Sequence, residues 1–280
     1  MEEGMSPIGM AWLETMGVVL LAGLGAAAGW RCSKWRGYWW LVGYATPLSI
    51  MAAISLSRWF PRLELAPPFA WIMAGRVEFA LLACACAMMM TSLVSRLRRR
   101  GEKVSLMVLM VVFVAGQSIP SFLAPAFNYR HLTDLMTLVD VDGVCIQSNG
   151  YTCGPAAAVT ALHQIGVEAG EGDLAILAHT TRMTGTQADV LCEVITAHYG
   201  VPCRQAYFRT IDELRACVPV IAVVKYALLI DHFVTVLEVT DAMVVVGDPL
   251  AGRVEMTREE FAGRWRKHGI ILERPIRDIE

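Results

Sequence analysis

Four stretches of mostly apolar residues fill the first 127 positions of this 280-residue chain. They are residues 8–30, 38–57, 67–94 and 104–125, and about 20 apolar residues suffice for a helix to cross the hydrocarbon core of a bilayer. The third stretch contains Arg76 and Glu78, and charges near the middle of a bilayer are costly. The sequence therefore predicts a transmembrane region of about four helices over residues 1–127, with the weakest pattern in the third.

Basic residues gather in two of the predicted loops. Arg31, Lys34 and Arg36 follow the first stretch, and residues 96–103 after the third stretch are rich in arginine. Because basic loops are retained in the cytoplasm, everything after residue 125 is expected on the outer face of a bacterial inner membrane. The side would be reversed if the third stretch did not cross.

The charge balance differs between the two halves of the chain. Residues 1–127 carry 11 basic and 6 acidic residues, whereas residues 128–280 carry 13 basic and 20 acidic residues. Hydrophobic residues make up 55% of the chain, which excludes a disordered protein and disfavours an ordinary soluble enzyme. An acidic second half without a basic patch also argues against nucleic-acid binding.

The second half has the pattern of a compact α+β domain over residues 143–280, reached through a polar connector at 128–142. Helical patterns come first, at 154–166, 172–179 and 187–199. Strand patterns follow at 219–226, 232–239, 242–246, 253–256 and 270–273, with a capped helix at 257–265 before the last strand. Helices followed by an antiparallel run of strands indicate α+β and not a doubly wound sheet.

Cys153 lies immediately before the first of these helices. At a helix N-terminus, unpaired N–H groups and the helix dipole stabilise a thiolate, which is the nucleophilic form of cysteine. Gln147 precedes Cys153 across a turn containing Asn149 and Gly150. Its side-chain amide and the backbone N–H of Cys153 are candidate donors to the oxyanion of an acyl-transfer reaction.

A base and an orienting group are also present. His232 opens an alternating strand, and Asp248 ends the next one. Adjacent antiparallel strands would place Asp248 beside His232, with the second ring nitrogen facing Cys153, as in a Cys-His-Asp triad. Asp231 is the weaker candidate because neighbouring residues on a strand point to opposite faces.

These residues resemble the C39 family of papain-like cysteine peptidases, known mostly from bacteriocin-exporting ABC transporters that cut leader peptides after a double glycine. The resemblance covers roughly residues 140–273 and rests on Gln147, Cys153-Gly154, His232, Asp248-Pro249, Gly252, residues 256–261 and Trp265. It implies a papain-like fold, with Gln147 in the oxyanion hole, Cys153 as nucleophile, His232 as base and Asp248 as orienter.

The sequence departs from that family in three ways. Thr152 stands where an acidic residue often precedes the cysteine, the domain follows the membrane region, and the sequence has no phosphate-binding loop of an ATPase. The double-glycine substrate therefore does not transfer directly. We expect a peptide or protein substrate, which could be a leader peptide, held near the bilayer; a transporter partner is possible, and neither metal nor cofactor is needed.

Two other functions remain open from the sequence. A thioester on Cys153 could be resolved by an amine, as in an acyltransferase or amidase, and some C39-like domains are binding modules without catalysis.

Four further cysteines of the domain could form up to two disulfides or remain free thiols: Cys145, Cys192, Cys203 and Cys217. In the membrane region, the Gly25–Gly29 spacing, the Cys84–Cys86 pair and the Arg76 and Glu78 charges are interpreted as packing or pairing between helices.

Overall fold

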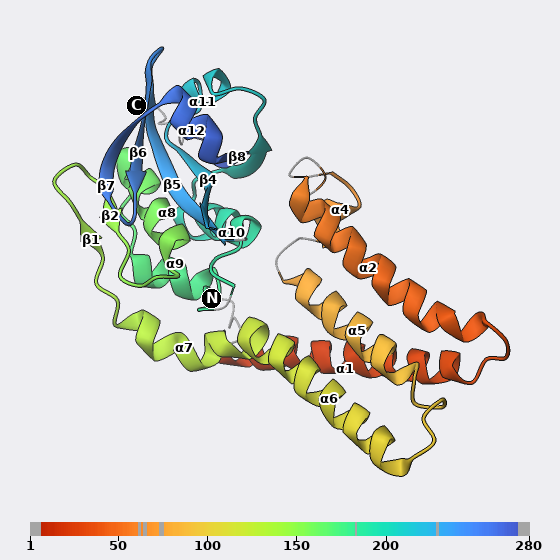
Figure 1. Ribbon diagram of the computed structural model, residues 1–280. Coiled ribbons are helices and arrows are strands. Elements are labelled where there is room, and N and C mark those ends of the chain that lie inside the picture. Colours follow the sequence, from red (N-terminus) through yellow and green to blue (C-terminus); the bar gives the residue numbers. More distant parts are fainter. Residues whose placement is uncertain are drawn as a thin grey trace. The chain divides into compact units, whose positions relative to one another are not determined.

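A computed structural model describes residues 7–60, 63, 66–72, 76–182, 184–227 and 230–273. By its internal contacts the chain divides into two units, Met1–Phe127 and Asn128–Glu280. Figure 1 shows the helical first unit in red to yellow and the mixed second unit in green to blue. Each unit is described by itself.

The first unit is a bundle of helices. Its described elements are α1 (Pro7–Ser33), the short η1 (Trp39–Leu41), α2 (Val42–Trp59), α4 (Phe69–Ile72), α5 (Val77–Thr91), α6 (Arg100–Ser118) and the π-helical η2 (Ile119–Leu123), from which α7 (Ala124–Thr133) continues into the second unit. Three segments of the described chain are long and apolar enough to cross a membrane: Ala11–Ser33, Trp39–Ser57 and Arg100–Thr133.

The prediction of four long spans is therefore wrong at the third stretch. Residues 67–94 form the short α4 and the 15-residue α5, and residues 73–75 between them lie outside the described part. The tandem Pro67 and Pro68 cannot supply N–H groups to a helix, and Arg76 and Glu78 interrupt the apolar run near its middle. At about 1.5 Å per residue, α5 alone is shorter than the hydrocarbon core.

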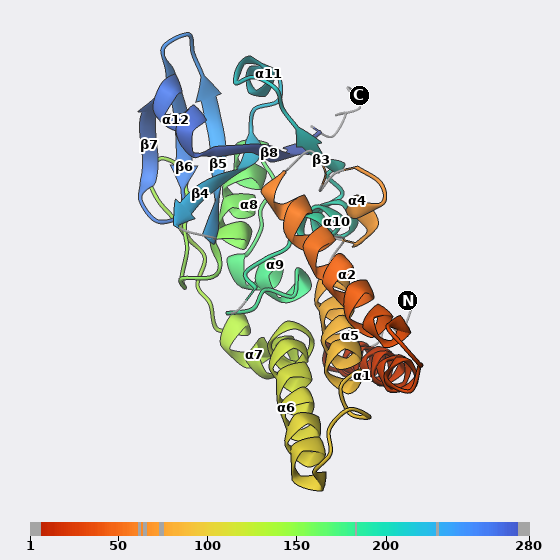
Figure 2. The same ribbon diagram turned by 45° about the vertical axis from the view of Figure 1, so that its right-hand side comes forward.

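The third stretch is nevertheless packed tightly into the bundle. A Cβ atom added to Gly25 or Gly29 of α1 would collide with the backbone carbonyl oxygens of Cys84 and Met88 in α5. From the first contact to the second, the residue numbers increase along both helices, so α1 and α5 run parallel. The two helices lie together in Figures 1 and 2. The glycine spacing thus marks a close helix–helix contact, as small residues do in membranes.

Arg76 is buried and links three segments of this bundle. Its guanidinium forms an ion pair with Glu14 of α1 and donates a hydrogen bond of 2.9 Å to the carbonyl of Ser121 in η2. Four residues after Ser121, Pro125 has no N–H, so this carbonyl cannot form the i to i+4 hydrogen bond of an α-helix. The structure thus agrees with the expectation that Arg76 pairs between helices.

The described part of the second unit holds two small strands, six larger strands and five helices after α7. The hairpin of β1 (Leu138–Val139) and β2 (Cys145–Ile146) is followed by α8 (Cys153–Gln164), α9 (Glu171–Leu177), α10 (Ala188–Tyr199), β3 (Cys203–Tyr207), α11 (Asp212–Arg215), β4 (Val220–Ala227), β5 (Ile230–Val239), β6 (Met243–Asp248), β7 (Gly252–Thr257), α12 (Arg258–Arg264) and β8 (Trp265–Leu272). The predicted connector is therefore partly regular, since α7 and β1 extend into it.

The large sheet is antiparallel, with the order β3-β8-β4-β5-β6-β7. The run from β4 to β7 is the expected meander. Two features differ from the sequence-based expectation: β3 was not predicted, and β8 begins at Trp265, five positions before the predicted strand. Figure 2 shows β8, in dark blue, crossing between β4 and β3.

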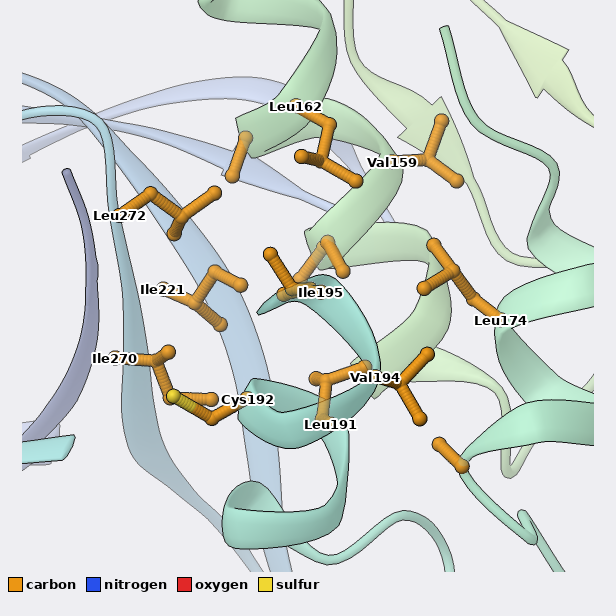
Figure 3. Packing of buried hydrophobic residues seen from close by; sticks show 14 of the residues in the cluster. Val159, Leu162, Leu174, Leu191, Cys192, Val194, Ile195, Ile221, Ile270 and Leu272 are labelled. Atoms are coloured by element: carbon orange, nitrogen blue, oxygen red, sulfur yellow. The ribbon is translucent and has the colours of Figure 1, made fainter. Parts of the chain in front are cut away.

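Two hydrophobic clusters hold the unit together. One packs α8, α9 and α10 against the sheet and includes Leu162, Leu174, Ile195 and Ile221, as Figure 3 shows. The other contains Phe261 of α12, Leu214 of α11 and valines of β4 to β6. A disulfide between Cys192 and Cys203 joins α10 to β3 beside the first cluster. Helices thus pack against the sheet in two separate cores. Thr235 of β5 donates a hydrogen bond of 2.7 Å to the carbonyl of Ala157, which fixes the first turns of α8 relative to β5.

Candidate active site

Cys153 is the first residue of α8, and its side chain is partly exposed. All nine residues that follow it, from Gly154 to Leu162, are buried, so the helix that carries the thiol is part of the core. Gly154 lies against the loop after α9, where an added Cβ would approach the Cβ of Thr186 to 2.8 Å. Glycine at this position therefore lets the loop pack close to the thiol.

His232 and Asp248 are joined by a direct hydrogen bond. The pairing of Thr235 with Gly247 brings the start of β5 next to the end of β6. Nε2 of His232 lies 2.7 Å from Oδ1 of Asp248, which also accepts the backbone N–H of Leu250 at 2.9 Å. Because Nε2 is engaged, Nδ1 is the ring nitrogen left to interact with Cys153.

The electrostatics of this group favour an ion pair. Burial lowers the pKa of His232, but hydrogen bonds to Asp248 and Cys153 outweigh it and raise the pKa to about 9. Burial also opposes ionisation of Asp248, but the hydrogen bonds from His232 and Leu250 dominate and lower its pKa. At neutral pH the imidazole is therefore protonated between two groups that accept its hydrogens.

Gln147 lies in the loop between β2 and α8. Its backbone N–H donates to the carbonyl of Pro249 at 2.9 Å, which ties the loop to the turn after Asp248. Its side-chain Nε2 donates to the carbonyl of Asn149 at 2.6 Å, and Nε2 carries a second hydrogen that can serve another acceptor. Thr152 closes the loop, since its hydroxyl bonds both the N–H and the carbonyl of Asn149.

The structure thus brings Cys153, His232 and Asp248 together and attaches the Gln147 loop to the same turn. Asp231 is directed elsewhere, because it forms an ion pair with Arg266 at 2.7 Å. His268 is buried outside this group of residues, and burial lowers its pKa to about 4. Among the described residues, no group of three or more His, Cys, Asp and Glu side chains could hold a metal ion.

Two neighbours of the site were not anticipated. The ring of Tyr226 on β4 lies 5.7 Å from that of His232, and the tyrosine is 64% exposed. Glu171 of α9 binds Ser148 in the Gln147 loop. The consecutive strand patterns of β4 and β5 could have suggested the first contact, since residues near opposite positions of paired strands are neighbours. No local sequence pattern predicts the contact between Glu171 and Ser148.

Comparison with known proteins identifies the family of this region. The model of the Peptidase C39 family matches residues 143–275. An uncharacterized protein of Methanothermobacter marburgensis is 33% identical over 141 residues, covering 50% of this chain and 95% of that protein. An uncharacterized protein of Methanothermobacter thermautotrophicus is 30% identical over 132 residues, covering 47% of this chain and 89% of that protein.

Two crystal structures are similar over about the same length. One is a double glycine motif protease from an AMS/PCAT transporter in complex with the leader peptide, with 18% identity, a TM-score of 0.42 and coverage of 47% of this chain and 91% of that chain. The other is the peptidase domain of Streptococcus ComA, with 22% identity, a TM-score of 0.42 and coverage of 46% and 96%. The assignment depends on the family match over residues 143–275 and not on these two structures.

Proposed function

Because the chain belongs to the peptidase C39 family, we propose that it is a membrane-embedded cysteine peptidase that cleaves a peptide bond through a thioester on Cys153. The observation that carries the proposal is the contact of His232 with both Asp248 and Cys153 at the start of α8. A nucleophile, a base and an orienting carboxylate in mutual contact are the requirements for acyl transfer through a thiol. A domain that only binds peptides needs none of them.

In the proposed reaction, the Cys153 thiolate attacks the carbonyl carbon of the scissile bond. The carbonyl oxygen becomes an oxyanion, which the second N–H of the Gln147 amide and the backbone N–H of Cys153 stabilise. The imidazolium of His232 then gives its Nδ1 proton to the leaving amine as the carbon–nitrogen bond breaks. Water, deprotonated by the same nitrogen, attacks the thioester, releasing the acid and the thiolate.

Asp248 has an orienting role in this scheme. Its bond to Nε2 fixes the ring so that Nδ1 faces the sulfur, and its charge favours the imidazolium. The positive charge of His232 favours the thiolate of Cys153, and the thiolate is the form that attacks the substrate. No metal or cofactor takes part in the scheme.

We also propose that the peptidase lies on the outer side of a cytoplasmic membrane. Ser33 at the end of α1 lies within 2.5 Å of Ser95 after α5, and Arg96 donates to the carbonyl of Trp35. Although α5 is shorter than a full span, these contacts support placing the loop after it on the same side as the loop after α1. That side is the cytoplasm by the positive-inside rule. α6 starts at Arg100 beside them, so one crossing takes the chain to the other side before the peptidase begins.

The first experiment tests both proposals through the reactivity of Cys153. Intact spheroplasts producing the wild type or Cys153→Ser are labelled at mildly acidic pH with a membrane-impermeant alkylating reagent, before and after lysis. Activated thiolates react at this pH, whereas ordinary thiols are protonated. Labelling of intact wild-type spheroplasts, but not of the variant, supports an activated nucleophile outside the cytoplasm.

The other outcomes separate the two proposals. Labelling only after lysis keeps the peptidase and overturns its location. No labelling that depends on Cys153 in either case removes the support for catalysis and favours a binding module. Comparison of protein N-termini in cells with the wild type or Cys153→Ala then tests peptide cleavage, because a peptidase creates new N-termini whereas an acyltransferase creates modified amines.

A further inference from the structure

Glu171 is a buried carboxylate that the proposed chemistry does not use. It is the first residue of α9, and its exposed fraction is 0%. A carboxylate removed from water is costly unless strong hydrogen bonds compensate for lost hydration. The partners of this side chain therefore indicate what it stabilises.

Both oxygens of the carboxylate bind the same residue. Oε1 accepts the backbone N–H of Ser148 at 2.8 Å, and Oε2 accepts the Ser148 hydroxyl at 2.7 Å. Hydrogen bonds to a charged acceptor are stronger than those between neutral groups, and two of them fix orientation as well as distance. The backbone N–H of Glu171 in turn donates to the Thr137 hydroxyl at 2.8 Å.

Ser148 lies between the two residues that define the position of the candidate oxyanion donor. Gln147 precedes it, and Asn149 follows it with the carbonyl that accepts Nε2 of Gln147 at 2.6 Å. The backbone N–H of Gln147 is held on the other side by Pro249. A shift of Ser148 therefore moves both ends of the bond that orients the amide.

The helix that carries Glu171 is rigidly connected to the nucleophile. Leu174 and Ala175 of α9 are fully buried, and Leu174 belongs to the hydrophobic cluster that includes the α8 residues after Cys153. Figure 3 shows Leu174 facing Val159 of α8. Glu171 thus joins the Gln147 loop to the same frame that holds the thiol.

We propose that Glu171 is a positioning residue that holds Ser148, and through it the amide of Gln147, in the place required for the oxyanion hole. The inference rests on the proposed function, because an oxyanion hole has meaning only for acyl transfer. It assigns to a buried carboxylate of α9 a part in the reaction without contact with substrate. Small displacements of positioned groups can lower rates strongly, so the effect should be visible in kinetics.

The test compares two reactions of Cys153 in the full-length chain purified in detergent. p-Nitrophenyl acetate acylates the thiolate through a tetrahedral oxyanion, with p-nitrophenolate as leaving group, whereas iodoacetamide alkylates it by displacement of iodide and forms no oxyanion. Burial and the nearby Glu171 carboxylate raise the pKa of the Cys145 thiol to about 12, so Cys145 reacts little with either reagent. Cys153→Ala, made in the wild type and in each variant, gives the background for each rate, because Glu171→Gln removes one of the causes of the raised Cys145 pKa.

The variants are Glu171→Gln, Gln147→Ala and their combination, with Glu168→Gln at an exposed position as a control that loses the same charge. Removing an oxyanion donor lowers rates by about 10²–10³, so Gln147→Ala should lower acylation by this amount. Glu171→Gln should lower acylation by about tenfold or more while leaving alkylation unchanged. In the double variant, Glu171→Gln should add little to Gln147→Ala, because both act through one donor.

Ser148→Ala keeps the backbone bond to Glu171 and removes the hydroxyl, which contacts Glu171 and the carbonyl of Met136. It should show a smaller loss of acylation with the same selectivity, which keeps the test valid if Glu171→Gln folds poorly. Equal losses of acylation and alkylation, or full additivity with Gln147→Ala, would show a purely structural role and overturn the inference. So would an unchanged acylation rate in Glu171→Gln. If the wild type shows no reaction that depends on Cys153, the proposed function itself fails and the inference fails with it.

Discussion

Nε2 of His232 and Oδ1 of Asp248 are 2.7 Å apart, and this bond makes the stability of the domain depend on pH. Together with Cys153 it raises the pKa of His232 to about 9, although burial opposes the charge, from an ordinary value near 6.5. The imidazolium therefore stabilises the folded state fully below about pH 6.5. This contribution is lost as the pH rises through about 9.

The Asp248→Asn variant tests this relationship. Without the carboxylate the pKa of His232 falls, so the variant should lose less stability than the wild type between pH 6.5 and 9. Thermal unfolding followed by tryptophan fluorescence at several pH values measures the difference. Parallel curves for wild type and variant across this range would contradict the assigned bond.

The contact between α1 and α5 gives a prediction for the membrane region. Gly29→Ala should destabilise the bundle by about 1–3 kcal/mol, because the new methyl group meets the carbonyl of Met88. Gly17→Ala is the matched control on the same helix, since nothing lies within 4 Å of a Cβ there. Unfolding in mixed detergent micelles compares the two, and equal effects would argue against the close contact.

The ion pair of Arg76 and Glu14 should be strongly coupled. Arg76→Gln leaves Glu14 and the Ser121 carbonyl without their donor, so we expect a loss of stability of about 3 kcal/mol. Once Arg76 has been replaced, Glu14→Gln should cost little more, because the carboxylate has already lost its partner. A double-mutant cycle in detergent measures the coupling, and additive losses would contradict the pairing.

The disulfide between Cys192 and Cys203 should stabilise the peptidase unit. Since 11 positions separate the two cysteines, replacing Cys192 by Ser should lower stability by about 2–3 kcal/mol. Cys217→Ser is the control, because Cys217 is a free thiol. Unfolding midpoints with and without reductant provide the measurement; a wild type that is indifferent to reductant would count against the bond.

The sequence was sufficient for the parts of the fold that have strong local patterns. Apolar runs or apolar alternation between turn residues mark α8, α10 and strands β4 to β7. His232 and Asp248 could be paired because their strands are consecutive. Strand β3 has no such pattern, since its residues are mostly half-buried at a sheet edge. The first five residues of β8 also lack a strand pattern, because this part of the strand is polar and includes Lys267 and His268.

The supporting contacts of the site could not be predicted for a different reason. Glu171 and Ser148 are 23 positions apart and come together only through the packing of α9 on α8. A glutamate at a helix start is ordinarily exposed, where it favours the helix dipole. Its burial depends on the tertiary structure, which short sequence windows do not contain.

The position of β8 in the sheet determines when the framework of the candidate site is complete. It lies between β3 and β4 in the sheet, although it is the last strand of the described chain to be synthesised. Until the ribosome has made Leu272, β3 is unattached to the sheet and β4 has an open edge. Exposed strand edges invite pairing with other chains, so the nascent domain needs protection until β8 has been made. The residues of the candidate site, all synthesised earlier, gain their final framework only when β8 joins the sheet.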